Sequence, residues 1–265
     1  MRAPFPGPEF APGTVWLVGA GPGDPGLLTL HAWRALEAAD VVLHDALVSP
    51  EILALARPDA RREAVGKRAG GRGTRQIAIN ERLVALARQG LRVLRLKGGD
   101  PLLFGRGGEE ALALVAAGIG FRIVPGISAA LGAAAAAGIP LTHRGLAHSL
   151  AFATGHDSAG EVPADIDWAG LSRGAGVIVL YMALRRVGEI AAALRAAGRG
   201  ADEPVAFIAN ATTPRQSVHI ATLATAAAVA AAIPPDAPTL IVIGPVVALA
   251  PLLASGALPA LALAA

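Results

Sequence analysis

The segment 14–45 constrains the fold most, because it reads as a strand, a glycine loop, a helix and a second strand in succession. TVWLVG (14–19) is a short apolar run of β-forming residues, GPGDPG (21–26) is a loop, and residues 27–39 have apolar side chains at helical spacing. DVVLHD (40–45) is the next strand. Two strands joined by a helix in so short a segment pair in parallel through a right-handed crossover. The chain is therefore predicted to be an α/β protein.

The alternation of helices and strands continues and then changes in character. Helices are predicted over 80–90, 107–118 and 127–138, with strands over 91–96 and 121–126. Beyond these, apolar strands are separated by fewer and shorter helices, and they lie at 149–156, 176–182, 203–210, 217–223 and 238–244.

This change of character predicts two domains and a tail. The first thirteen residues are rich in proline and glycine and are expected to form a mobile tail over 1–13. An N-terminal α/β domain is expected over 14–141 and a C-terminal α/β domain over 142–265. No repeat of fixed period is visible, which argues against a solenoid or a propeller.

Composition narrows the function classes. The chain has no cysteine, which excludes disulfides, thiolate metal sites and a cysteine nucleophile, and the cytoplasm is the expected location. The net charge is only +3 and the arginines are scattered, so no nucleic-acid surface is predicted. The uncharged stretch 237–265 is interrupted by four prolines, so TLIVIG is predicted to be a buried strand rather than part of a membrane span.

The first glycine loop, GAGPGDPG (19–26), lies where a dinucleotide-binding turn would lie, after a strand and before a helix. Its spacing fails, because Asp24 stands where the third glycine of G-x-G-x-x-G is required. Pro22 and Pro25 also remove amide donors. The loop therefore favours a neutral or cationic ligand over a phosphate, and a plain tight turn is the alternative.

The second glycine loop, RLKGGDPLLFGRGGEE (95–110), ends a predicted strand at Gly98-Gly99. Ligands of parallel α/β sheets gather outside the carboxyl ends of the strands, so both glycine loops are expected at one site. The carboxylate of Asp100 can accept hydrogen bonds from a ligand, or it can cap a turn. Asp45 ends another strand, and with Lys67 it forms either a proton acceptor and donor pair or a surface ion pair.

Taken together, these segments resemble the uroporphyrinogen-III C-methyltransferases of the tetrapyrrole methylase family. The resemblance covers nearly the whole chain after the tail, and GKRAG with RLKGGDP and FGRGGEE is its most characteristic part. The motifs that carry it occur in family order, and they are VWLVGAGPGDPGLLTL, VVLHDALVS, VGKRAGGRG, RLKGGDPLLFGRGGEE, VPGISAA, GIPLTHR, ATGH and YMAL.

The resemblance implies two α/β domains with S-adenosylmethionine in the cleft between them, and a homodimer. It implies Asp45 as the proton acceptor and Lys67 as the proton donor. The implied cofactor contacts are Pro22, Gly98, Gly99, Asp100, Leu103, Ser128, Ala129, Met182 and Ala211. His44 departs from the family, which usually has tyrosine there, and Ala183 and Ala211 stand where glycine is usual.

The implied reaction methylates uroporphyrinogen III at C2 and then C7 and gives precorrin-2, for sirohaem or cobalamin synthesis. Its substrate carries eight carboxylates, for which Arg68, Arg106 and Arg144 are candidate ligands. No metal site is predicted. The alternatives are a methyltransferase of a later precorrin or of the diphthamide precursor, a nicotinamide-dependent oxidoreductase, and a tetrapyrrole carrier without activity.

Overall fold

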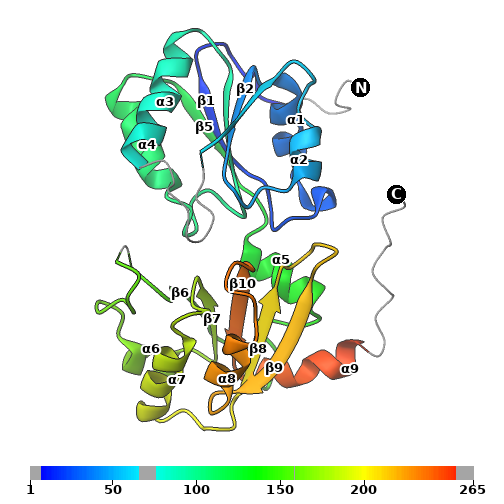
Figure 1. The fold of residues 1–265 in the computed structure, drawn as a ribbon, viewed down its shortest axis with the longest axis vertical. Coiled ribbons are helices and arrows are strands. Elements are labelled where there is room, and N and C mark those ends of the chain that lie inside the picture. Colours follow the sequence, from blue (N-terminus) through cyan, green and yellow to red (C-terminus); the bar gives the residue numbers. More distant parts are fainter. Residues whose placement is uncertain (1–6, 66–75, 158, 255–265) are drawn as a thin grey trace. The chain divides into compact units, whose positions relative to one another are not determined.

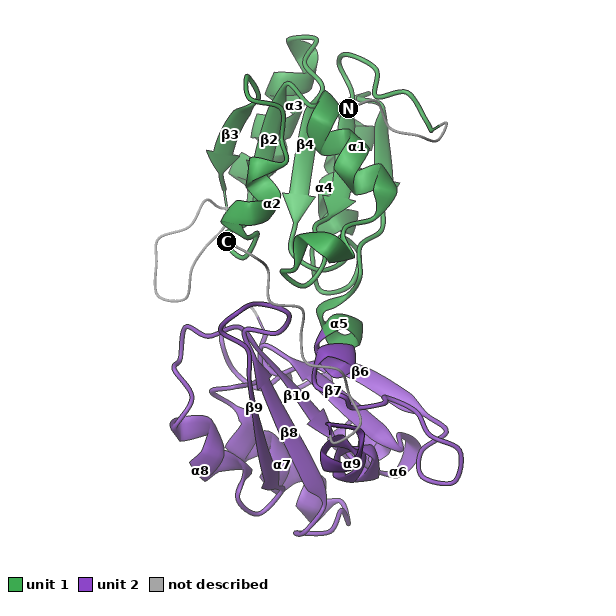
Figure 2. Cartoon of the chain, turned by 90° about the vertical axis from the view of Figure 1, so that its right-hand side faces the viewer, with its two compact units in different colours: residues 1–132 green, residues 133–265 purple. Residues whose placement is uncertain are grey.

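The computed structural model describes residues 7–65, 76–157 and 159–254, and the chain forms two compact units. Figure 2 shows these units as residues 1–132 and 133–265. Their boundary falls inside helix α5 (Ala129–Ala136), nine residues before the boundary expected at 141/142. Each unit contains its own five-stranded sheet, so the predicted α/β class with two sheets is confirmed.

The sheet of the first unit is entirely parallel, with the strand order β3-β2-β4-β1-β5. Gly19, at the end of β1, pairs with Lys97 at the end of β4, which brings the two glycine loops to one edge. The strands are β1 Val15–Gly19, β2 Val41–His44, β3 Arg61–Ala64, β4 Val93–Lys97 and β5 Phe121–Val124. The helices before α5 are η1 Pro25–Leu27, α1 Leu30–Ala38, α2 Pro50–Ala54, α3 Gln76–Arg88 and α4 Gly107–Ala116.

Helices cover both faces of this sheet (Figure 1). Strand residues alternate between the faces, so Leu94 and Leu96 of β4 pack with α1 and α2. Val93 packs with α3 and α4 on the other face. Arg95 and Lys97 follow Val93 at intervals of two residues and thus share its face. A central strand covered on both sides is expected to be apolar, which makes these two cations exceptional.

The described part of the expected mobile tail is instead anchored, and this corrects the prediction. Phe10 is 7% exposed and stacks on Trp16 with a ring separation of 4.6 Å. Its carbonyl oxygen accepts a hydrogen bond of 2.9 Å from Nε of Arg92. The amide of Gly13 donates to Leu91 O at 3.1 Å. The proline and glycine content of residues 7–13 therefore gave the wrong prediction, because the aromatic side chain of Phe10 packs against Trp16 of β1.

The sheet of the second unit is mixed, with the order β6-β7-β10-β8-β9. β6 and β7 are parallel, while β10 is antiparallel to both β7 and β8, so β7 and β8 run in the same direction. The strands are β6 Leu150–Thr154, β7 Val177–Tyr181, β8 Pro204–Ala209, β9 Ser217–Thr222 and β10 Thr239–Ile243. The helices are α6 Trp168–Gly174, α7 Val187–Ala196, α8 Ala226–Ala231, η2 Pro245–Leu249 and α9 Ala250–Ala254.

Alternate residues of the second sheet build its core. Ile178, Phe207 and Ile241, from β7, β8 and β10, pack in one cluster with α7 and α8. TLIVIG, which the sequence predicted to be a buried strand, forms β10 and is buried along its whole length. In the described residues, no helix is long and apolar enough to cross a membrane.

Candidate functional site

The two glycine loops of the first unit are joined directly to each other. Gly99 N donates to Gly21 O at 2.8 Å, and Gly21 N donates to Gly99 O at 3.2 Å. Both glycines have left-handed backbones, with φ of 72° at Gly21 and 67° at Gly99. The sequence expectation that the two loops lie at one sheet edge is confirmed.

A third loop, which contains Gly126, lies against the same two glycine loops. A Cβ at Gly126 would lie 2.3 Å from Gly99 O, and a Cβ at Gly19 would lie 2.5 Å from the same oxygen. These backbones are thus in contact, and no side chain fits between them. Gly132 in α5 makes similar room for Pro22, whose Cγ would be 2.4 Å from an added Cβ. The structure therefore brings together the candidate cofactor residues Pro22, Gly98, Gly99, Ser128 and Ala129.

Asp100 links the second glycine loop to the third loop through hydrogen bonds of its carboxylate. Its Oδ1 accepts from Leu102 N at 2.8 Å, and its Oδ2 accepts from Gly126 N at 3.1 Å. The turn-capping alternative for this residue is therefore what the structure shows, although each oxygen keeps capacity for a further donor. Asp24 has a comparable local role, since its Oδ1 accepts from Gly26 N at 2.7 Å and caps η1.

The turn after Asp100 contains unusual backbone conformations. Phe104 and Arg106 have positive φ, 53° and 59°, which side chains other than glycine rarely adopt. Such strain persists where the surroundings enforce it, and it gathers at binding sites. Leu103, a candidate cofactor contact, lies in this turn and is half-buried. Arg106, a candidate substrate ligand, is exposed and pairs with Glu109 through an Nη2–Oε2 contact of 2.6 Å.

The second unit places its two candidate cofactor residues at one sheet edge. Met182 follows β7 and Ala211 follows β8, and these strands run in the same direction. Met182 has φ of 54°, while Asn210 and Thr212, on either side of Ala211, have φ of 48° and 61°. The same signature of backbone strain thus marks both loops. Met182 is 47% exposed and available for contact.

Ala183, where the family usually has glycine, is tightly packed. A Cβ at Gly155 would lie 2.3 Å from both the Cα and the Cβ of Ala183, so the close approach of the two backbones requires glycine at 155. The Gly155 amide also donates to Tyr181 O at 2.7 Å. The ATGH segment therefore packs against the YMAL segment.

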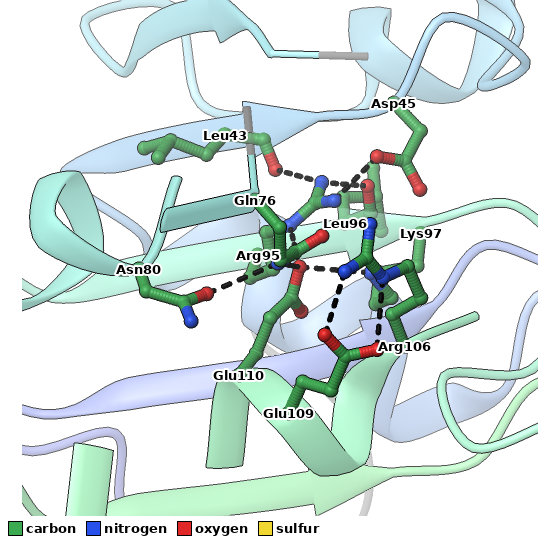
Figure 3. Close-up of polar contacts among 10 residues, drawn as sticks. All are labelled: Leu43, Asp45, Gln76, Asn80, Arg95, Leu96, Lys97, Arg106, Glu109 and Glu110. Atoms are coloured by element: carbon green, nitrogen blue, oxygen red, sulfur yellow. Dashed lines mark hydrogen bonds and ion pairs between the residues drawn. The ribbon is translucent and has the colours of Figure 1, made fainter. Parts of the chain in front are cut away.

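Asp45, the candidate proton acceptor, is part of a buried network of charges (Figure 3). It pairs with Nη2 of Arg95, whose Nε donates to Oε1 of Glu110 at 3.0 Å. Lys97 Nζ donates to the same Glu110 oxygen at 3.0 Å. The Asp45 side chain is 29% exposed, whereas Arg95 and Lys97 are 2% exposed and Glu110 is fully buried. Asp45 is the one carboxylate of this network that a ligand could reach.

The charges of the network balance, with two cations and two carboxylates. Burial lowers the pKa of the Lys97 ammonium, the positive charge of Arg95 lowers it further, and Glu110 opposes both effects. Gln76 Nε2 also donates to Glu110 Oε1, at 3.2 Å. Among the described residues, Oε2 of Glu110 has no hydrogen-bond partner. The hydrogen bonds of this carboxylate therefore converge on one oxygen.

Of three further predicted residues, the structure describes only one. Lys67 and Arg68 lie outside the described residues. Arg144 is exposed in the second unit, in a turn closed by the paired backbones of His143 and Ala147. In the described part of the chain, no group of three histidine or acidic side chains is placed to hold a metal ion.

Sequence reasoning missed Arg95 and Glu110 as parts of the site. Lys97, which lies within the predicted second glycine loop (95–110), forms the last residue of β4. The signal was present, because Arg95 in the predicted strand 91–96 and Lys97 directly after it are charged at alternate positions, where a central strand should be apolar. Buried cations require partners, and the partner here is Glu110.

Comparison with known proteins finds relatives that match most of this chain. A family model described as Tetrapyrrole (Corrin/Porphyrin) Methylases matches residues 14–227. A uroporphyrinogen-III C-methyltransferase from Sinorhizobium sp is 58% identical over 242 residues, which are 91% of this chain and 86% of the relative. A siroheme synthase from Pseudomonas fluorescens (strain SBW25) is 52% identical over 91% of this chain. The chain spans only 52% of that relative.

Solved structures show the same relationship. The uroporphyrin-III C-methyl transferase from Thermus thermophilus complexed with S-adenyl homocysteine has a TM-score of 0.78 and 42% identity, over 89% of this chain and 99% of that one. A cobalt precorrin-4 methyltransferase has the same TM-score with 26% identity, over 90% and 98% of the two chains. The family match covers most of the chain and includes all the loops described above. The chain belongs to the tetrapyrrole (corrin/porphyrin) methylase family.

Proposed function

We propose that the chain transfers methyl groups from S-adenosylmethionine to C2 and then C7 of uroporphyrinogen III and gives precorrin-2. The observation that carries this proposal is the 58% identity to a uroporphyrinogen-III C-methyltransferase, since it extends over 91% of this chain. The uroporphyrin-III C-methyl transferase from Thermus thermophilus and the cobalt precorrin-4 methyltransferase have the same TM-score of 0.78, but their identities to this chain are 42% and 26%. Sequence identity therefore favours uroporphyrinogen III over a later precorrin.

The loops of each unit fit S-adenosylmethionine as their ligand. The Gly98-Gly99 turn leaves room for close approach, because the nearest atom to an added Cβ at Gly98 is Leu47 Cβ at 3.6 Å. Asp24 and Asp100 bring negative charge to the loops, which suits a ligand with a positive sulfur and an ammonium group. The residues proposed to hold it are Pro22, Gly98, Gly99, Asp100, Leu103, Ser128, Ala129, Met182 and Ala211. When bound, S-adenosylmethionine supplies an electrophilic methyl group.

The residues of the chain supply orientation and proton transfer in this proposal. Methylation of a ring carbon releases a proton, and the partly exposed carboxylate of Asp45 is the proposed acceptor. Lys67 is the proposed donor. Arg68, Arg106 and Arg144 are proposed to bind the substrate carboxylates. We further propose a homodimer that works in the cytoplasm, on the basis of the family resemblance and the absence of cysteine.

Product identification tests this function. The purified chain is incubated without oxygen with uroporphyrinogen III and S-adenosylmethionine that carries a labelled methyl group. Mass spectrometry is expected to find a product with two labelled methyl groups, together with two equivalents of S-adenosylhomocysteine. Methylation of a later precorrin combined with no reaction of uroporphyrinogen III would contradict the proposal. Asp45→Asn is expected to bind S-adenosylhomocysteine normally and to lose turnover.

A further inference from the structure

Contacts of all three guanidinium nitrogens fix the orientation of Arg95. Its Nε donates to Glu110, while its Nη1 donates to two backbone carbonyls, Leu96 O at 3.3 Å and Leu43 O at 3.5 Å. Its Nη2 is directed at Asp45 (Figure 3). Because the guanidinium is a planar, rigid fork, fixing Nε and Nη1 fixes the direction of Nη2.

The backbone of Asp45 is fixed by the same strand that carries Arg95. Asp45 N donates to Leu96 O at 3.1 Å, so this oxygen accepts both from Asp45 and from Arg95. β2 and β4 are also in parallel register, with Leu43 beside Arg95. The remaining freedom of the Asp45 carboxylate lies in its side-chain torsions, and the contact with Nη2 restricts them.

Glu110 is the side-chain anchor of this arrangement. It lies in the first turn of α4 and is fully buried, so bulk water cannot replace its oxygen as an acceptor. One oxygen, Oε1, accepts from Arg95, Lys97 and Gln76. Gln76 is held in turn by Asn80, whose Oδ1 accepts from Nε2 of Gln76 at 3.0 Å. The position of Oε1 is thus determined from α3 and β4 together.

We propose that Glu110 is a positioning residue for the reaction, which acts through Arg95 to hold the Asp45 carboxylate in the orientation that accepts the substrate proton. This inference rests on the proposed function, since it assumes that Asp45 is the proton acceptor. Glu110 itself is buried beneath the site and contacts neither substrate nor cofactor in this scheme. Its contribution is geometric, and its loss affects turnover more than substrate affinity.

Two double variants test the proposal, Lys97→Met/Glu110→Gln and Lys97→Met/Glu110→Met. Both remove one cation and one anion, so the charge balance of the network is kept, and both replace Glu110 by a side chain of similar length. Only the glutamine variant offers an oxygen to Nε of Arg95. The kcat of the methionine variant is expected to be on the order of 100-fold lower than that of the glutamine variant, with the same KM in both. Equal kcat values in the two variants would overturn the proposal.

Crystal structures of the same two variants separate this inference from the proposed function. The contact between Arg95 Nη2 and Asp45 is expected in the glutamine variant and is expected to be lost in the methionine variant. Its retention in both would show that Glu110 does not position Asp45. Failure of the wild-type chain to methylate uroporphyrinogen III would instead reject the proposed function, while the crystallographic comparison would still decide the positional role.

Two single variants distinguish a loss of position at Asp45 from other causes of a lower kcat. Glu110→Asp keeps the charge but withdraws the carboxylate by one methylene, so kcat is expected to fall while KM is unchanged; unchanged kcat would count against the proposal. Glu203→Gln is the matched control, because Glu203 is 16% exposed and pairs with Arg199 in the second unit. It removes a carboxylate charge from an ion pair outside the site, so kcat is expected to be unchanged; an equal loss of kcat would show that loss of a buried charge, and not the position of Asp45, explains the effect.

Discussion

Gly21 and Gly99 exchange both of their backbone hydrogen bonds, although they lie in loops that follow different strands. This isolated antiparallel bridge lies just beyond the parallel pairing of β1 and β4, whose last pair is Gly19 and Lys97. The left-handed backbone at both glycines turns the two loops toward each other. The proposed cofactor residues of the first unit depend on this junction.

Gly99→Ala is expected to weaken cofactor binding. Alanine at a φ of 67° costs about 1 kcal/mol in backbone strain and shifts the bridge to Gly21. Calorimetry with S-adenosylhomocysteine measures the loss of affinity. Gly118→Ala is the matched control, since Gly118 has a φ of 70° with no atom within 4 Å of an added Cβ. The control is expected to lose similar stability with normal affinity, and equal affinities of the two variants would contradict the prediction.

Gly126→Ala is expected to destabilise the first unit by about 3 kcal/mol, toward the upper end of overpacking costs, because backbone atoms cannot move aside as a side chain can. The added Cβ would lie 2.3 Å from Gly99 O and 2.8 Å from Gly19 Cα. Urea unfolding followed by circular dichroism checks this. Gly108→Ala adds a Cβ with no neighbour within 4 Å in the first turn of α4, so it is expected to leave stability unchanged or increase it. A similar loss in both variants would refute the packing argument.

Much of this arrangement was predictable from local pattern. The βαβ unit at 14–45, the meeting of the glycine loops and the burial of β10 follow from periodicity and from the rule for strand ends. The family and the enzyme class, which the motifs indicated, are confirmed by the comparisons. The mechanistic roles of Asp45 and Lys67 stay predictions, because they came from resemblance.

Other parts could not be predicted, for reasons of tertiary structure. β3 is a polar edge strand, and it forms because its backbone pairs with β2 rather than because of any apolar alternation. The partnership of Arg95 with Glu110 joins β4 to α4, and nothing in the spacing of these residues specifies which side chains meet. The tail is anchored by Phe10, which stacks on Trp16, and by the amide of Gly13, which donates to Leu91 O, and local sequence specifies neither partner.

Asp100→Ala is expected to weaken cofactor binding mainly through loss of loop order. The substitution removes the acceptor of Leu102 N, which is exposed, and of Gly126 N, which is half-buried, at about 1 kcal/mol for each hydrogen bond lost. Asp100→Asn keeps one good acceptor and is expected to give an intermediate affinity for S-adenosylhomocysteine by calorimetry. In the control Asp167→Ala, an N-cap bond to Gly170 N is lost in the second unit. The affinity of this control for S-adenosylhomocysteine is expected to match that of the wild type. An unchanged affinity in Asp100→Ala would contradict the role of Asp100 in ordering the loops.

Acid is expected to destabilise the chain through Glu63. Hydrogen bonds from Arg82 hold the pKa of the Glu63 carboxyl below its ordinary value of 4.5. Because the folded pKa is the lower one, the stabilisation is fully present above pH 4.5 and is lost as the pH falls through the folded value. The difference in unfolding free energy between wild type and Glu63→Gln is therefore expected to shrink below that pH. Urea unfolding from neutral pH to about pH 3 measures it.

Glu203→Gln provides a control of opposite sign for this titration. Burial raises the pKa of the Glu203 carboxyl above its ordinary value of 4.5, in spite of the opposing charge of Arg199. The folded state then binds the proton more tightly, so the contribution of Glu203 to stability decreases as the pH rises from 4.5 through the folded value. The same pH trend in Glu63→Gln and Glu203→Gln would contradict both assignments.

Arg144→Ala is expected to raise KM for uroporphyrinogen III and to leave kcat and the affinity for S-adenosylhomocysteine unchanged. Arg144 is exposed at the tip of its turn, where Gly145 has a φ of 87°, so its loss removes charge without disturbing packing. A charge-assisted hydrogen bond to a substrate carboxylate contributes about 1.5 kcal/mol, which corresponds to about a tenfold increase in KM at low salt. Added salt screens this attraction, so the difference in KM between Arg144→Ala and the wild type is expected to narrow as ionic strength rises.

Arg88→Ala, at the exposed end of α3, is the matched control and is expected to change neither KM nor its salt dependence. An equal increase of KM in both variants would show that general surface charge, and not Arg144, attracts the substrate.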